Sequence, residues 1–428
     1  MGLFLRLAFF FALFVPWLAS AASVRHTGGV SLDVQRQSPN ITYSLGAPLQ
    51  SGGTHPGGIV VADFNGDGKL DVAVSNIDQN SVAVFLNSSS RIFAPLMTVP
   101  IITPVQLNNS LGLNIRSLAV GDFNEDSKPD LVVSTVAGNQ ASIVLLGNGD
   151  GTFSQQPPIP NSFGFFHAQV VDLNGDGHQD LVFAMNGSLG VSLGNGDGTF
   201  GAMAVLPPGS FPGTYLGLAV ADFNDDGKLD IAATDFGFGG FGTLVFYAGN
   251  GDGTFAAPTA VTLEISSFPG SLASGDFNGD GKQDLLIGFP SSALIVFGNG
   301  DGTFNQAFDS LKFVYVGSFA TITTNPVTVF AADLTHNGKF DAVTSDFDAG
   351  TLQIALNKAI GFPARTPGIF SFSLAPGLTD IAVGDLNNDG VLDVVVINFQ
   401  TSEISVLLSH KHGPKKTHHH DMQRRVQR

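Results

Sequence analysis

Short apolar runs alternate with short acidic stretches along most of this chain. In one segment, an apolar run from Gly217 to Val220 precedes an acidic loop at Asp222, and further apolar runs follow at Leu229–Thr234 and Thr243–Tyr247. Apolar runs of about four to eight residues bounded by Gly, Asn and Asp are typical of buried strands. No helical periodicity separates them, so the pattern predicts antiparallel strands joined by tight turns.

A glycine-rich turn follows the third apolar run in several repeats. Its sequence is Gly-Asn-Gly-Asp-Gly-Thr-Phe, and it begins at Gly147, Gly194, Gly249 and Gly298. Asn-Gly and Asp-Gly supply the positive φ angles that tight hairpins need. In the segment above, this turn predicts a fourth strand near Ala256–Leu263.

The acidic loop recurs seven times, starting at Asp63, Asp122, Asp172, Asp222, Asp276, Asp333 and Asp385. Four short strands in a period of about 50 residues are typical of a β-propeller blade. We therefore predict an all-β protein, with a seven-bladed β-propeller of four-stranded antiparallel blades over residues 40–409. The last repeat has no fourth strand of its own. We expect the strand Ile41–Leu45 to complete the seventh blade and close the ring, which removes open sheet edges.

The ends of the chain differ from the repeats. Residues 1–22 resemble a signal peptide, with Arg6, an apolar run at Leu7–Trp17 and a small-residue cleavage site at Ala19–Ala21. Residues 23–39 form a polar linker, and residues 410–428 form a basic, His-rich tail. No later segment is long enough to span a membrane. We therefore expect a secreted protein, located outside the cell, on its surface or in a periplasm.

The acidic loop has the residues that a hard cation requires. Calcium takes about six to eight oxygen ligands from carboxylates, carbonyls and water. In the first copy, Asp63, Asn65 and Asp67 stand at positions one, three and five, Lys69 offers its backbone carbonyl at position seven, and Asp71 closes the set at position nine. The second position is apolar in every copy, which predicts that one side of the loop is anchored in the blade.

The same positions in the other copies, except position seven of the Asp333 copy, give the full set of predicted ligands. They are Asp63, Asn65, Asp67, Lys69, Asp71, Asp122, Asn124, Asp126, Lys128, Asp130, Asp172, Asn174, Asp176, His178, Asp180, Asp222, Asn224, Asp226, Lys228, Asp230, Asp276, Asn278, Asp280, Lys282, Asp284, Asp333, Thr335, Asn337, Asp341, Asp385, Asn387, Asp389, Val391 and Asp393. The Asp122 copy has Ser127 in place of the bend glycine, and the Asp333 copy has lost one carboxylate. We expect six or seven calcium ions, with a structural role.

Other metals and other loop types fit this pattern less well. An EF-hand needs a glutamate at position twelve of its loop, where this chain has apolar strand residues such as Val74. Zinc is disfavoured because the chain has no Cys and few His near the loops. The net charge of −17 comes largely from the loops and disfavours nucleic acid as a partner.

The loops and their flanks, such as Val61 to Val74, resemble the FG-GAP (VCBS-type) repeat. That repeat forms the seven-bladed propeller of integrin α-chains and of many exported bacterial proteins. The resemblance implies calcium in hairpin loops on one face, with partner binding elsewhere, often on the opposite face. We expect a protein- or matrix-binding adhesion module.

Two other function classes stay open. The chain has no nucleophile elbow, zinc-protease motif or cysteine nucleophile, and His167 is an isolated histidine, so we expect a binding module rather than an enzyme. A polysaccharide lyase or hydrolase with a dispersed site is the less favoured alternative. A lectin-like glycan-binding propeller is the other, and the aromatic segments Phe163–Phe166 and Phe236–Phe241 are candidate exposed patches.

Overall fold

The computed structural model separates the chain into two compact units, residues 1–33 and 34–428. It describes residues 41–87, 98–99, 115–135, 142–185, 187–207, 214–236, 242–262, 269–290, 292–304, 327–357 and 369–411. The predicted signal segment 1–22, the linker 23–39 and tail residues 412–428 lie outside the described residues. Within the described ranges, no helix has the length and apolar character to cross a membrane.

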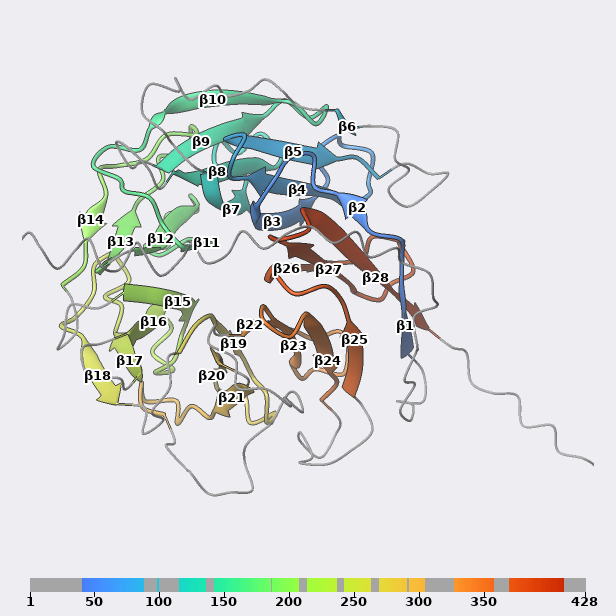
Figure 1. The fold of residues 1–428 in the computed structure, drawn as a ribbon. Coiled ribbons are helices and arrows are strands. Elements are labelled where there is room, and N and C mark those ends of the chain that lie inside the picture. The colour runs from blue at the N-terminus through green and yellow to red at the C-terminus, as the bar shows by residue number, and fades with distance from the viewer. Residues whose placement is uncertain are drawn as a thin grey trace, which may run out of the picture. The chain divides into compact units, whose positions relative to one another are not determined.

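Seven antiparallel sheets make up the second unit, and each is one blade of a propeller (Figure 1). Blades 1 to 3 consist of β3 (Pro56–Ala62), β4 (Asp71–Asn76), β5 (Ser81–Phe85) and β6 (Thr98–Val99); β7 (Ile115–Gly121), β8 (Asp130–Thr135), β9 (Ser142–Gly147) and β10 (Phe153–Pro158); and β11 (His167–Val171), β12 (Asp180–Met185), β13 (Ser188–Ser192) and β14 (Ala204–Val205).

The remaining blades follow in chain order. Blades 4 to 6 consist of β15 (Thr214–Ala221), β16 (Asp230–Phe236), β17 (Gly242–Tyr247) and β18 (Thr259–Thr262); β19 (Leu272–Gly275), β20 (Asp284–Phe289) and β21 (Ser292–Val296); and β22 (Thr328–Ala332), β23 (Asp341–Asp346), β24 (Thr351–Ala355) and β25 (Ile369–Ser373). Blade 7 consists of β26 (Leu378–Gly384), β27 (Asp393–Asn398), β28 (Glu403–Lys411), β1 (Ile41–Leu45) and the short β2 (Leu49–Gln50). Blade 5 has three strands among the described residues.

The first strand of each blade faces the middle of the ring. These strands, β3, β7, β11, β15, β19, β22 and β26, contact one another in that order, and β26 contacts β3. The contacts therefore close into a circle, as Figure 1 shows. The predicted seven-bladed all-β propeller is confirmed.

The ring closes through the two ends of the propeller segment. β1 pairs antiparallel with β28, with Ile41 opposite Lys411 and Leu45 opposite Leu407. The expected closing strand Ile41–Leu45 is confirmed. β28 runs through Lys411, so His410 and Lys411, which the sequence analysis assigned to the tail, are strand residues.

Apolar side chains fill the spaces between neighbouring blades. Each of the seven apolar clusters joins residues of two adjacent blades, as Phe64 and Ala73 of blade 1 pack with Leu131 of blade 2. Second strands lie between two such clusters, and β4, β12, β20, β23 and β27 are buried along their whole length. This double burial explains why apolar residues occupy consecutive positions after the first aspartate of each of these strands.

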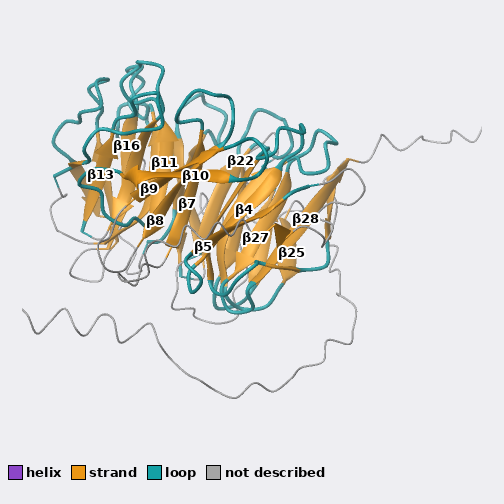
Figure 2. Ribbon diagram, turned by 90° about the horizontal axis from the view of Figure 1, so that it is seen from above, coloured by secondary structure: helices purple, strands orange, loops and turns teal. Residues whose placement is uncertain are grey.

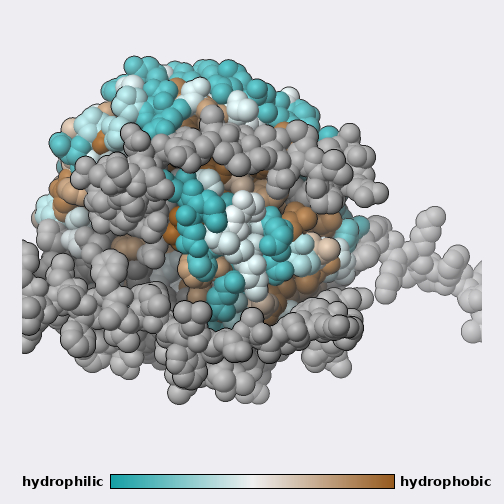
Figure 3. Space-filling view, turned by 45° about the horizontal axis from the view of Figure 1, so that its top comes forward, coloured by the Kyte–Doolittle hydropathy of each residue, from teal (hydrophilic) through white to brown (hydrophobic). Residues whose placement is uncertain are grey.

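The loops gather at the two opposite ends of the strands (Figure 2). Because strands alternate in direction within a blade, first-to-second and third-to-fourth connections emerge at one end and the other connections at the opposite end. Figure 3 shows hydrophilic residues gathered along the upper rim of the surface in that view.

Candidate cation-binding loops

Every acidic loop connects the first and second strands of its blade, so all seven lie at the same end of the propeller. The glycine-rich hairpins follow the third strands of blades 2, 3, 4 and 5 and lie at this end too. The second position of each loop is buried as expected, from Leu334 at 0% exposure to Leu173 at 4%. Positions one and three are half-buried, and position five is exposed in every copy.

The aspartate at position nine is buried inside the blade. Asp71 is 0% exposed; its Oδ2 accepts the N–H of Phe64 at 3.0 Å and its Oδ1 accepts the N–H of Asn87 at 2.7 Å. It thus ties the second loop position to the residue that follows the third strand. Equivalent pairs of bonds are made by Asp130, Asp180, Asp230, Asp284 and Asp393. Asp341 accepts the N–H of Thr335, at position three, and the N–H of Asn357.

Burial changes the acidity of these aspartates. Loss of solvation raises the pKa of Asp71 and of Asp284 to about 6, and the backbone N–H bonds offset only part of the effect. The pKa of Asp341 rises to about 7 for the same first cause. A divalent cation beside such a carboxylate would favour the ionised form.

The exposed side of the loop is held by its own side chains. Asp63 accepts the N–H groups of Asp67 at 3.1 Å and Gly68 at 2.7 Å. Asn65 Oδ1 accepts the Asp67 N–H at 3.0 Å, and Asp67 Oδ1 accepts the Lys69 N–H at 3.0 Å. The same ladder recurs in the loops that start at Asp122, Asp222 and Asp385.

The hydrogen bonds of this ladder leave the loop oxygens able to bind a hard cation. Each carboxylate or amide oxygen has two lone pairs, and one backbone N–H uses only one of them. Side chains fixed in this way still offer oxygen ligands of the type that calcium prefers. Among the described residues, no group of three or more His, Asp or Glu side chains forms a ready metal cluster. A cation here would therefore also need the Asn side chain and backbone oxygens.

Two loop positions have left-handed backbone conformations. Position six has positive φ in every copy, with 81° at Gly68 and 64° at Ser127. Position four does so too, although it is glycine in only three copies; the others are Glu125, Asp225, His336 and Asn388. The bend at position six was predicted from its glycines, whereas the conformation of position four was not, because the residue types at position four vary.

The Asp333 loop differs from the other loops in its contacts. Thr335 occupies position three, and its buried Oγ1 has no hydrogen-bond partner. Asn337 occupies position five and donates its side-chain amide to the carbonyl of Asn357 at 2.7 Å. This loop is therefore fixed partly by the rest of its blade.

The loops also join neighbouring blades. The carbonyl of Phe64, at position two of the first loop, accepts the N–H of Gly151 in the hairpin of blade 2 at 2.8 Å. Gly198 and Gly302 donate in the same way to Phe123 and Phe223. The rings of these Phe residues also meet a hairpin Phe edge-on, as Phe64 meets Phe153 at 5.7 Å between centroids.

In two blades that lack the glycine-rich hairpin, an asparagine side chain donates instead to the carbonyl of the second loop residue in the neighbouring blade. Asn87 of blade 1 donates its amide to the carbonyl of Leu386 in the loop of blade 7 at 2.6 Å. Asn357 of blade 6 donates to the carbonyl of Phe277 in the loop of blade 5 at 2.5 Å. Neither asparagine lies in an acidic loop, and neither was singled out as a site residue from the sequence.

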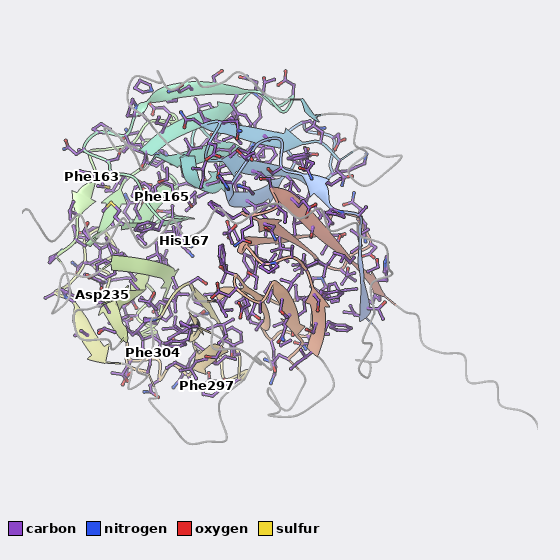
Figure 4. The ribbon with its side chains drawn as sticks, in the orientation of Figure 1. Phe163, Phe165, His167, Asp235, Phe297 and Phe304 are labelled. Carbon is purple, nitrogen blue, oxygen red and sulfur yellow. The ribbon has the colours of Figure 1, made fainter. Side chains whose placement is uncertain are left out.

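The isolated candidates have varied surroundings (Figure 4). His178 contacts Glu125 of the neighbouring loop through Nδ1. Burial lowers the pKa of His167 to about 4, which keeps its imidazole neutral. Phe163 is 50% exposed, whereas Phe165 is 0% exposed. Residues 237–241 of the second aromatic segment lie outside the described part of the chain.

The propeller with one acidic loop per blade defines a class of repeat protein. A family model described as "FG-GAP-like repeat" matches residues 63–133, 122–183, 172–233, 233–287 and 276–344. These matches together cover more than half of the chain. The chain belongs to the FG-GAP-like repeat family.

The curated relatives are integrin α-chains. Human integrin alpha-6 is 28% identical over 214 residues, which cover 45% of this chain and 19% of that protein. Mouse integrin alpha-7 is 26% identical over 289 residues, 61% of this chain and 24% of the relative. The matched part of the chain thus spans about a fifth to a quarter of the length of these relatives.

One solved structure has the same fold over most of its length. It belongs to an Agrocybe aegerita lectin described as recognising non-reducing terminal N-acetylglucosamine. The TM-score is 0.52 at 19% sequence identity, with 83% of this chain and 85% of that chain covered. The likeness establishes the shared fold.

Proposed function

We propose that this chain is an exported, calcium-binding propeller that acts as a protein- or matrix-binding adhesion module. Membership of the FG-GAP-like repeat family and the similarity to integrin α-chains support a binding or adhesion role. The loop ladder supports calcium, and it is the observation that carries this part of the proposal. Export is supported by residues 1–22, in which a positively charged residue, an apolar run and a small-residue cleavage site follow one another.

In the first loop, Asp63, Asn65 and Asp67 would hold the ion with side-chain oxygens, and Lys69 would add its carbonyl. Asp71 would contribute charge from inside the blade. A bound ion would offset the repulsion among these carboxylates. It would thereby stabilise the folded loop, because an ion that binds only the native state stabilises it by mass action.

Metal removal and reloading test the calcium part. We expect the melting temperature of the full chain to fall after treatment with EGTA and to recover with calcium. Asp67→Ala should bind about one calcium ion fewer per chain by titration calorimetry. Asp150→Ala is the matched control, because Asp150 is an exposed aspartate of a hairpin that bonds Thr152 within its own turn. An unchanged melting curve after verified metal removal would rule out the calcium role.

A glycan ligand is the second candidate. The shared fold with the lectin motivates it, although that similarity does not extend to the ligand. An array of glycans and matrix proteins, probed with calcium and with EGTA, separates the two candidates. Calcium-dependent signal on matrix proteins alone supports the adhesion module, and signal on glycans alone replaces it with a lectin.

A further inference from the structure

The backbone N–H and carbonyl of the second loop residue form hydrogen bonds that link neighbouring blades. In blade 1, the Phe64 N–H donates to Asp71, and the Phe64 carbonyl accepts from Gly151 in the hairpin of blade 2. That hairpin begins at Gly147, whose N–H donates to Asp130, the position-nine aspartate of the next loop. Each step therefore leads from one buried aspartate to the next.

The two asparagines make the same step directly. Asn357 donates its side-chain amide to the Phe277 carbonyl in the blade 5 loop and its backbone N–H to Asp341 in the blade 6 loop, both at 2.5 Å. Asn87 connects Leu386 of blade 7 to Asp71 of blade 1 in the same manner. One residue thus contacts two loops in neighbouring blades.

Two junctions differ from the others. Among the described residues, the carbonyls of Leu173 in blade 3 and Leu334 in blade 6 accept no such bond from the next blade. Blades 4 and 7 have no asparagine in the place of Asn87 and Asn357, but the loops of blades 6 and 7 contact each other directly, because the His336 ring contacts the carbonyl of Gly390 through Nε2 at 3.1 Å. In blade 7 that place is taken by Ser409, whose hydroxyl donates to Asp393 of its own blade.

We propose that the loops are coupled through these bonds in one series, which runs from blade 4 through blades 5, 6, 7, 1 and 2 to blade 3 and is open between blades 3 and 4, with Asn87 and Asn357 as positioning residues. The proposal rests on the cation-binding function proposed above for the loops. A loop that is ordered by its ion fixes its second residue and therefore the hairpin or asparagine of the next blade. The next loop then has less order to gain, which makes binding by neighbouring loops of the series positively cooperative.

Hydrogen exchange of the full chain in EGTA tests the coupling without metal. Asn357→Ala removes the side-chain amide but keeps the backbone bond to Asp341. We expect exchange of the peptide covering residues 276–284, in the neighbouring blade, to accelerate by about fivefold or more. Asn148→Ala is the control, because that side chain donates to Thr152 within its own hairpin. A change confined to blade 6 would overturn the proposal.

A second pair of variants tests the series and its open end. Asp276→Ala perturbs the blade 5 loop and should accelerate exchange at residues 333–341, and Asn357→Ala should abolish this response in the double variant. Asp172→Ala in blade 3 should change exchange at residues 122–130 and leave residues 222–230 unchanged. An equal response at 222–230 would overturn the break between blades 3 and 4. If Asn357→Ala does not fold, Asn87→Ala with readout at residues 385–393 replaces it.

A calcium titration followed by the same exchange measurement separates this proposal from the calcium proposal. We expect neighbouring loops of the series to gain protection together as the calcium concentration rises. Protection of each loop at its own concentration, independent of its neighbours, counts against coupling. If no loop responds to calcium while the Asn357→Ala effect persists in EGTA, the calcium function fails and the coupling stands.

Discussion

The carbonyl of Phe277 accepts a 2.5 Å hydrogen bond from the side-chain amide of Asn357, which lies 80 residues later in the chain. Phe277 belongs to an acidic loop of blade 5, and Asn357 follows the third strand of blade 6. The bond makes the loop a part of the junction between two blades. A residue change in one blade can therefore alter the loop of its neighbour.

Aromatic packing at these junctions should contribute strongly to stability. Phe223 is 1% exposed and meets Phe304 of the next blade edge-on at 5.6 Å. We expect Phe223→Ala to lower the free energy of unfolding by about 3–5 kcal/mol, because the cavity cannot be refilled. Urea unfolding followed by circular dichroism measures it. Phe163→Ala, at a half-exposed phenylalanine, is the control, and a loss of similar size there would contradict the junction argument.

Backbone strain in the second loop should be removable. Ser127 holds a φ of 64° where the other loops have glycine. We expect Ser127→Gly to raise the free energy of unfolding by about 1 kcal/mol, since left-handed conformations cost non-glycine residues about that much.

Gly177→Ser is the matched reverse change in the third loop. Nothing lies within 4 Å of a Cβ placed there, so only the φ of 91° opposes it. Gly177→Ser should lower the free energy of unfolding by a similar amount, as measured by urea unfolding with EGTA present. Equal signs for the two variants would refute the strain argument.

Asp235 should make stability depend on pH. It is 2% exposed, its Oδ1 has no hydrogen-bond partner, and burial raises its pKa to about 6. The ordinary value is about 3.9, so the folded state favours the protonated form. The contribution of Asp235 to the free energy of unfolding is fully present below about pH 4 and is lost as the pH rises through about 6.

Asp235→Asn removes the buried charge and tests this sign. The variant should exceed the parent in unfolding free energy at pH 7.5 by about 1–3 kcal/mol, since one pKa unit corresponds to about 1.4 kcal/mol. At pH 4 the gain should vanish. Asp225→Asn, at an exposed residue of the same blade, should show no such change. A gain for Asp235→Asn of equal size at both pH values would contradict the assignment.

Tyr43 in the closing strand should respond in opposite directions to two substitutions. Its ring is buried against Phe370 at 5.3 Å, but its hydroxyl is buried without a partner. Tyr43→Phe should stabilise by about 1 kcal/mol because it removes an unsatisfied polar group. Tyr43→Ala should destabilise by about 3 kcal/mol or more and expose the blade 7 edge. Thermal melts measure both, and a loss of stability in Tyr43→Phe would contradict this account.

The sequence was sufficient to predict the ring and its closure. The repeat period counts the blades, and the unmatched strand Ile41–Leu45 identifies the partner of the incomplete last blade. Burial of the second loop position was predictable as well, because Phe or Leu occurs there in every copy. These features are local or periodic, and a periodic pattern can be recognised in the sequence without any knowledge of tertiary contacts.

The roles of single polar residues could not be predicted in the same way. Asp71 and Asp67 look alike in sequence, yet Asp71 is buried with two backbone N–H partners and Asp67 is exposed. The side chains of Asn87 and Asn357 also reach carbonyls in neighbouring blades, and the sequence spacing does not indicate these contacts. Position four of the loops adopts positive φ with four non-glycine residues, which hides the conformation from composition.

The pairing of β1 with β28 sets the order in which the molecule can be completed. Ser44 of β1 and His410 of β28 contact each other across 366 residues. During synthesis, β1 leaves the ribosome long before its partner exists, so it must wait unpaired while six other sheets form. The last blade is therefore the step at which a newly made chain is exposed to misassembly, and protection of its free edge would matter most at that moment.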